Sequence, residues 1–180
     1  MFLKSMELSN GDILDLYEMT SNDIKPAVLL IADIMDDGEA EYAHITMRHH
    51  FNCKMLSLHD GREYYTLKNR GNHLLGLLGL HHYEWGPHEN VWLAWFGICQ
   101  ELRGQGIGKN LINFAEEFAY DRGYRKLFIE TYSGPVFKDA RVFYEKSGFR
   151  QAGTIANYMP NGDDMLIYYK KLGKDILVNA

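Results

Sequence analysis

The stretch Arg103-Gly-Gln-Gly-Ile-Gly108 lies between two segments of different pattern. It follows an apolar and aromatic run over 91–98, which is typical of a buried strand, and it opens a segment over 107–122 in which apolar residues recur at helical spacing. A glycine-rich turn from strand to helix exposes backbone N–H groups beside the positive end of the helix dipole. The stretch therefore predicts a site for phosphate or pyrophosphate, to which Arg103 adds a positive charge.

The glycine spacing separates this turn from two common phosphate loops. A dinucleotide-binding fingerprint needs glycine at its first, third and sixth positions, and the sixth position counted from Gly104 is Lys109. A nucleoside-triphosphate loop ending at Lys109 would need glycine at 103 and Ser or Thr at 110, where the chain has Arg103 and Asn110. The remaining pattern is Arg-x-x-Gly-x-Gly.

A second motif follows about forty residues later, over 140–149. Ala140, Phe143 and Tyr144 share one face of a predicted short helix, and Gly148 fits a left-handed helix C-cap. Residues 126–131 read as a strand between the two motifs. In order and spacing, the two motifs resemble the signatures of the GNAT superfamily of acetyltransferases, which bind acetyl-coenzyme A at the glycine-rich loop.

The resemblance covers about residues 60–172 and implies the α/β (α+β) GNAT fold, a mixed and mostly antiparallel sheet flanked by helices. We expect one N-acetyltransferase domain over 1–180. The segment 9–51 is predicted to be mainly helical and to break into two helices at 36–38. Further strands are predicted at 62–68, 72–83, 149–158 and 165–172, the last two joined by a turn at 161–162.

The resemblance also implies roles for individual residues. Tyr144 takes the place of the tyrosine that protonates the departing thiolate, and a phenol is a proton donor at neutral pH. Glu130 is one candidate for the general base, with Glu84 and Glu89 as others, and a water chain is an alternative. The resemblance implies that the following residues bind the coenzyme: Phe96, Gly97, Ile98, Arg103, Gly104, Gln105, Gly106, Ile107, Gly108, Lys109, Phe137 and Phe143. The first three of these would supply backbone N–H groups to the thioester carbonyl.

The chain departs from the usual pattern at Phe137, where superfamily members often have an asparagine that contacts the pantetheine arm. The segment 130–141 is longer than usual. Together with residues 162–164, it is similar to acetyltransferase modules fused to D-alanine–D-alanine ligase-like proteins.

Composition and net charge restrict the kinds of molecule that we expect the protein to bind. The net charge is −5 with no basic patch, which argues against nucleic acid and favours an amine acceptor, either a small molecule or a peptide. A candidate acidic rim for a cationic amine comprises Glu84, Glu89, Glu130, Asp163 and Asp164. The apolar stretches are too short to cross a bilayer and no signal peptide is evident, so we expect a cytoplasmic protein without membrane contact. A homodimer is left open.

A metal site is not expected. The pairs at 49–50 and 81–82 place adjacent histidines, which point apart on a helix or a strand, and no paired Cys-x-x-Cys is present. The leading function is an acetyl-CoA-dependent N-acetyltransferase, and the alternative is a non-catalytic acyl-CoA sensor. Retention of Tyr144 favours the enzyme.

Overall fold

The computed structural model describes residues 1–8 and 10–173, and its centre is an eight-stranded sheet. The strand order across the sheet is β1-β2-β3-β4-β5-β6-β8-β7, and every neighbouring pair is antiparallel except β5 and β6. The strands are β1 (Phe2–Glu7), β2 (Ile13–Glu18), β3 (Arg62–Asn69), β4 (Leu74–His81), β5 (Asn90–Ile98), β6 (Lys126–Tyr132), β7 (Arg150–Ile155) and β8 (Met165–Lys171).

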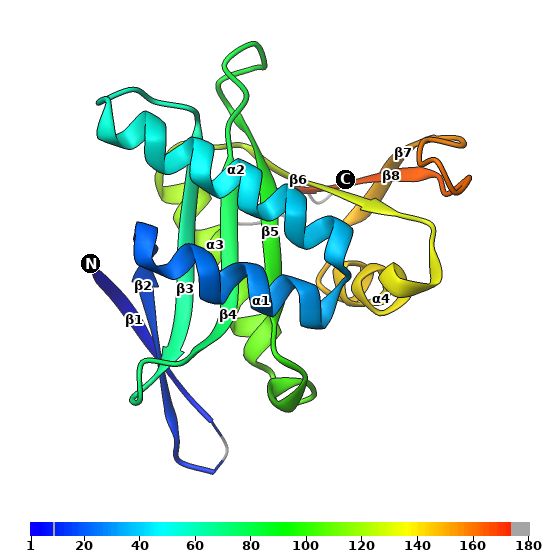
Figure 1. The fold of residues 1–180 in the computed structure, drawn as a ribbon. Helices are drawn as coiled ribbons and strands as arrows, with labels where there is room; N and C mark the ends of the chain where they lie inside the picture. Colours follow the sequence, from blue (N-terminus) through cyan, green and yellow to red (C-terminus); the bar gives the residue numbers. More distant parts are fainter. Residues whose placement is uncertain (9, 174–180) are drawn as a thin grey trace.

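Helices cover both faces of this sheet, as Figure 1 shows. The helices α1 (Ile24–Ile34) and α2 (Asp37–Met55) cross the face that is in front in Figure 1, and α3 (Ile107–Asp121) lies behind it. The short helix α4 (Lys138–Lys146) follows β6. In the described part of the chain, short 3-10 turns occupy Ser21–Asp23, Gln100–Leu102 and Pro135–Phe137.

The predicted fold class is confirmed, and the predicted helix over 107–122 and strands over 91–98 and 126–131 agree with α3, β5 and β6 to within one residue at each end. The later strands are shorter than predicted: β4 spans Leu74–His81 and β7 spans Arg150–Ile155. Gly148 has φ of +89°, as a left-handed C-cap requires.

The mainly helical prediction for 9–51 was wrong for its first part. Residues 13–18 form β2, which pairs with β1 on one side and β3 on the other. The physical reason is visible in the sequence, because Leu14 and Leu16 alternate with less buried neighbours and point into the core. The helices begin only at Ile24 and break before Asp37, where the Asp36 side chain accepts a hydrogen bond from the Glu39 amide (2.8 Å) and caps α2.

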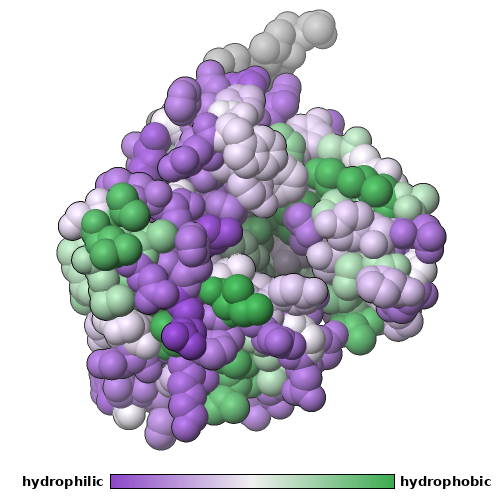
Figure 2. Space-filling view, turned by 45° about the horizontal axis from the view of Figure 1, so that its top comes forward, coloured by the Kyte–Doolittle hydropathy of each residue, from purple (hydrophilic) through white to green (hydrophobic). Residues whose placement is uncertain are grey.

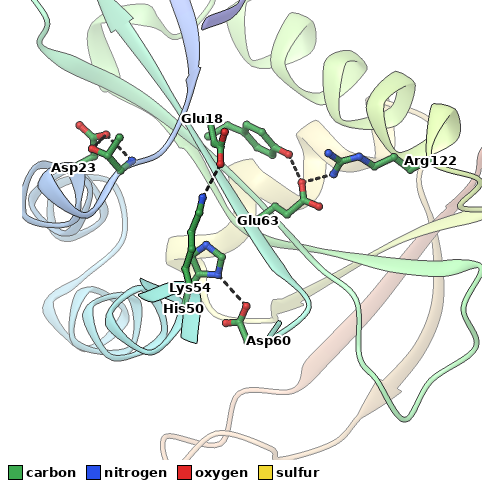
Figure 3. Close-up of polar contacts among 9 residues, drawn as sticks. Glu18, Asp23, His50, Lys54, Asp60, Glu63 and Arg122 are labelled. Carbon is green, nitrogen blue, oxygen red and sulfur yellow. Dashed lines mark hydrogen bonds and ion pairs between the residues drawn. The ribbon is translucent and has the colours of Figure 1, made fainter. Parts of the chain in front are cut away.

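Ion pairs connect the helices with one end of the sheet, and Figure 3 shows several of them. Lys54 of α2 contacts Glu18 of β2 (2.7 Å), and Arg122, which follows α3, contacts Glu63 of β3. His50 of α2 lies 2.9 Å from Asp60, just before β3. No helix in residues 1–8 and 10–173 is long and apolar enough to cross a membrane.

Candidate active site

The strands β5 and β6 separate in the middle of the sheet. Their parallel pairing runs from Asn90 and Lys126 to Leu93 and Ile129 and then stops, although β5 continues to Ile98 and β6 continues as well. One side of the second half of β5 is therefore without a strand partner. A gap bounded by exposed backbone groups opens at this point.

A β-bulge lies at the same place. Between β4 and β5 the register advances by two residues from Leu78 to Leu80 but by three from Leu93 to Phe96. The extra residue in β5 locally increases its bend and twist, which carries its second half away from β6. The bulge thus provides a physical reason for the gap.

The backbone amides of β5 alternate between this gap and β4. The Cys99 N–H donates to the Leu75 carbonyl in β4 (2.8 Å). Because amides alternate in direction along a strand, those of Phe96 and Ile98 point away from β4 and toward the gap, whereas that of Gly97 points toward β4. Position 97 favours glycine for a reason unrelated to the gap, because a Cβ at this position would come within 2.1 Å of the Ile34 Cδ1 atom of α1.

The glycine-rich stretch forms an open turn at the N-terminus of α3. Gly104 and Gly106 have φ of +75° and +80°, a backbone conformation that favours glycine, and no atom lies within 4 Å of a Cβ built on either residue. The first helical hydrogen bond joins the Asn110 amide to the Gly106 carbonyl (3.0 Å), and no side chain caps the helix. The amides of Ile107, Gly108 and Lys109 therefore remain for an anion.

A cavity of about 650 Å³ joins the gap, the open turn and the helices above them. Figure 2 shows a hollow on the face that it presents, with hydrophobic residues in its wall and hydrophilic residues around it. The wall is formed by Ile34, Met35, Glu39, His81, Tyr83, Trp92, Leu93, Ala94, Trp95, Phe96, Gly97, Ile98, Arg103, Gly104, Gly106, Gly108, Lys109, Glu130, Thr131, Tyr132, Val136, Phe137, Asp139, Ala140, Phe143 and Tyr144.

The cavity brings together both predicted catalytic residues and all but two of the predicted coenzyme residues. The two exceptions have other contacts. Gln105 is exposed and donates from its side chain to the Glu101 carbonyl (2.7 Å), and the Ile107 side chain is buried in the core. Of the predicted acidic rim, only Glu130 lines the cavity; Glu84, Glu89, Asp163 and Asp164 lie outside its wall.

Tyr144 occupies the part of the wall where α4 faces β5. Its side chain is only 7% exposed and is packed among the rings of Phe96, Phe143 and Phe149, at centroid distances of 5.7–6.4 Å. Burial raises the pKa of its hydroxyl above the ordinary value, so the phenol keeps its proton. Among the described residues, none hydrogen-bonds this hydroxyl, although it borders the cavity.

Two carboxylates face the other end of the cavity. Glu130 of β6 accepts a hydrogen bond from the Tyr132 hydroxyl (2.9 Å). Glu39 comes from the first turn of α2, and burial together with the negative charges of Asp36 and Glu130 raises its pKa. The sequence reasoning missed Glu39 and its neighbours Ile34 and Met35, because it assigned no role to the first sixty residues. The helix break at 36–38 was the available signal.

The loop between β6 and α4 is held by hydrogen bonds from a partly buried guanidinium group. Arg141 donates from Nη1 to the carbonyls of Tyr132 (2.5 Å) and Gly134 (2.9 Å). Phe137, which stands where an asparagine is common, packs edge-on against Tyr132 (5.3 Å between centroids). An aromatic surface therefore replaces an amide in this part of the wall.

This combination of splayed parallel strands, a following glycine-rich turn and a shared cavity defines an acyl-CoA-dependent transferase of the GNAT fold. The profile of the Acetyltransferase (GNAT) family matches residues 28–149. The chain belongs to this family and is an N-acetyltransferase.

Relatives and solved structures agree with this assignment. The chain is 29% identical over 146 residues to an aminoalkylphosphonate N-acetyltransferase of Salmonella typhimurium, covering 78% of this chain and 87% of that protein. It is 28% identical over 107 residues to a putative [ribosomal protein bS18]-alanine N-acetyltransferase of Bacillus subtilis, covering 59% and 67% of the two chains. A putative GNAT acetyltransferase of Desulfovibrio desulfuricans superposes with a TM-score of 0.77 at 18% identity, covering 89% and 99% of the two chains.

Proposed function

We propose that the protein transfers the acetyl group of acetyl-CoA to a primary amine of a small molecule or peptide by direct attack, with Tyr144 as the general acid. The observation that carries this proposal is the buried Tyr144 hydroxyl, which borders the same cavity as the open turn and the gap in the sheet. A side chain that donates a proton during the reaction needs an unoccupied hydroxyl in this position.

The coenzyme would enter along the second half of β5. The pyrophosphate would lie against the N–H groups that open α3, with Arg103 and Lys109 in the same part of the wall. The absence of side chains near Gly104 and Gly106 would let the phosphates approach the backbone. The pantetheine arm would then follow β5, past Phe143 and Phe137, toward the gap.

The chemical step follows from the groups around the gap. The amine nitrogen attacks the thioester carbonyl carbon, and the oxyanion that forms is stabilised by the backbone N–H groups of Phe96 or Ile98. When the C–S bond breaks, the departing thiolate takes the proton of Tyr144. The nitrogen loses its extra proton to Glu130, directly or through water, and the phenolate is reprotonated from solvent.

The experiment that tests the proposal combines the protein, acetyl-CoA and a panel of primary amines, and it measures free thiol release and the mass of the product. An acetylated amine formed together with one free thiol per product supports the enzyme. Calorimetric titration with acetyl-CoA is run in parallel. Tight coenzyme binding with no acetylated product from any amine would instead identify an acyl-CoA sensor.

A further inference from the structure

Glu39 is half-buried and Glu130 is exposed, and within the described residues neither contacts a cationic side chain, unlike several other acids of this protein. Six acids among the described residues contact a cationic side chain: Glu18, Asp23, Asp60, Glu63, Glu116 and Glu117. Figure 3 shows pairs of this kind near the start of β3, among them Lys54 with Glu18 and Arg122 with Glu63. Within residues 1–8 and 10–173, no Lys, Arg or His forms an ion pair with Glu39 or Glu130. Because Glu39 is half-buried and close to the negative charges of Asp36 and Glu130, its own charge is unfavourable there unless a ligand supplies a cation.

The cavity has two ends of opposite charge. It runs along β5, from Trp92 in the first half of the strand to Ile98 at its end, and Arg103 and Lys109 lie beyond that end. Glu130 lies at the other end, since it directly follows Ile129, which pairs with Leu93. Arg103 and Lys109 lie in or beside the turn that would bind pyrophosphate, so their charges would be occupied by the coenzyme and not by the acceptor.

The described wall has no Lys or Arg at the acidic end; Arg62, which lies outside the wall and pairs with Asp60 (3.3 Å), is a cation whose charge reaches His81 and Tyr83. His81 lines this end, but burial, assisted by the charge of Arg62, lowers its pKa to about 4, so its imidazole is neutral at pH 7. Burial and the charge of Glu130 raise the pKa of Tyr83, which keeps this phenol neutral as well. At this end of the described wall, an anionic group on the acceptor would therefore meet the carboxylates of Glu39 and Glu130 and no cation.

Aromatic rings complete the acidic end. His81 and Tyr83 have ring centroids 4.2 Å apart, Tyr83 packs edge-on to Trp92 (5.8 Å), and Tyr132 donates to Glu130 from the other side. The Trp95 indole is fixed by a hydrogen bond from Nε1 to the Thr46 hydroxyl of α2 (2.9 Å). Aromatic faces favour an aliphatic chain and an ammonium group.

From these contacts we infer that the acceptor is an aliphatic diamine or polyamine, whose second ammonium group contacts Glu39 while its other amine is acetylated beside Glu130. This inference rests on the proposed function and names the substrate class of the same site. Glu39 is then the specificity-determining residue, since it touches the part of the acceptor that does not react. The charge of Glu130 contributes to the same binding.

The test compares three acceptors with the same four-carbon chain and a different charge at the far end: diaminobutane, butylamine and aminobutanoate. We expect kcat/KM to fall in this order, with diaminobutane at least about tenfold above butylamine, the discrimination expected of one charge-assisted contact. Equal values for diaminobutane and butylamine, or a higher value for aminobutanoate, would overturn the inference and leave the N-acetyltransferase activity established. Aminoethylphosphonate is included as a second anionic amine, and preference for it would overturn the inference too.

The variant Glu39→Gln keeps the side-chain volume and removes the charge. We expect the ratio of kcat/KM for diaminobutane over butylamine to drop toward one, mainly through KM for the diamine. Glu41→Gln, on the exposed side of the same helix and outside the cavity wall, is the matched control and should keep the wild-type ratio. An unchanged ratio in Glu39→Gln would contradict the role of this residue.

Calorimetric titration of the CoA complex with diaminobutane provides a readout that does not depend on turnover. We expect weaker binding to Glu39→Gln than to Glu41→Gln, by at least about tenfold in Kd. If none of the amines is acetylated while acetyl-CoA binds, the proposed function fails and the inference fails with it. If amines are acetylated but the diamine binds both variants equally, only the inference fails.

Discussion

At the scale of single residues, the Tyr144 hydroxyl is the group on which the proposed chemistry depends. Tyr144→Phe removes one oxygen and keeps the ring among Phe96, Phe143 and Phe149, so packing and coenzyme affinity should persist. We expect kcat to fall by about a hundred- to ten-thousand-fold, the usual contribution of a general acid. Steady-state kinetics with the best amine measures this, and calorimetry checks acetyl-CoA binding.

The control for this substitution is Tyr169→Phe, which removes a hydroxyl from a β8 side chain outside the cavity wall. That variant should keep wild-type kcat. A Tyr144→Phe protein with wild-type kcat would assign the tyrosine a packing role alone. Because burial raises the pKa of Tyr144, we also expect no loss of rate from its ionisation as the pH rises toward the ordinary tyrosine value of about 10.

A second residue-scale prediction concerns Gly97, which the sequence placed at the coenzyme and the structure places against α1. Gly97→Ala puts a methyl group where the Ile34 Cδ1 atom lies, so helix α1 or the Ile34 rotamer must shift. We expect a loss of about 1–3 kcal/mol in the free energy of unfolding, measured by urea denaturation. Combining it with Ile34→Val, which removes that methyl group, should recover part of the loss. No recovery would contradict a steric cause.

At the scale of elements, the turn before α3 is expected to bind the pyrophosphate of acetyl-CoA. Gly106→Glu introduces bulk and negative charge where the phosphates would approach the helix N-terminus, and we expect the acetyl-CoA Kd to rise at least about a hundredfold. Calorimetric titration of the folded variant measures this. Unchanged affinity would remove the turn from the coenzyme site.

The two ends of the same helix provide a matched control for that experiment. Gly123, just beyond the C-terminus of α3, has φ of +84° and no atom within 4 Å of a built Cβ, so Gly123→Glu carries the same backbone strain in the same open surroundings. It should lose similar stability and keep wild-type affinity for acetyl-CoA. The difference between the two variants isolates the effect on the phosphates from the effect of strain.

The sequence predicted those elements whose signals are local. The turn at 103–108, the helix α3 and the strands β5 and β6 each follow from glycine spacing or from periodicity within one segment. The hairpin of β1 and β2 was missed, although Asn10-Gly11 is a recognised turn signal and Gly11 has φ of +86°. Within the cavity, Tyr144 and Glu130 were identified because they stand in or beside a motif.

The part of the cavity wall that comes from helices α1 and α2 could not be predicted in this way. Ile34, Met35 and Glu39 precede the glycine-rich turn by more than sixty positions, and they reach the cavity only because α1 and α2 fold over β4 and β5. Such proximity depends on tertiary packing, which periodicity and motif spacing do not report. The prediction of the acidic rim failed at Glu84 and Glu89 for the same reason, because these residues are close to β5 along the chain but lie outside the cavity wall.

At the scale of the whole molecule, the contact of Asp60 with His50 joins helix α2 to the sheet and should make stability depend on pH. The Asp60 side chain is 6% exposed and accepts hydrogen bonds from His50 Nδ1 (2.9 Å) and from the Arg62 amide (3.1 Å). Burial alone would raise the pKa of Asp60, but these hydrogen bonds and the charges of His50 and Arg62 outweigh it and lower the pKa below its ordinary value.

A carboxyl group whose pKa is lower in the folded state than in the unfolded state stabilises the fold fully above the unfolded value, about 3.9. This stabilisation is lost as the pH falls from there through the lower folded value. Asp60→Asn should therefore cost about 1.5–3 kcal/mol at neutral pH, as expected for weakening hydrogen bonds to a charged group, and the difference from wild type should shrink as the medium becomes strongly acidic. Thermal unfolding of both proteins across acidic to neutral pH measures this difference.

Asp33→Asn, at an exposed position near the end of α1, is the control and should follow the wild-type curve. A constant Tm difference between Asp60→Asn and wild type over the whole range would show that the Asp60 charge does not contribute to the stability of the fold.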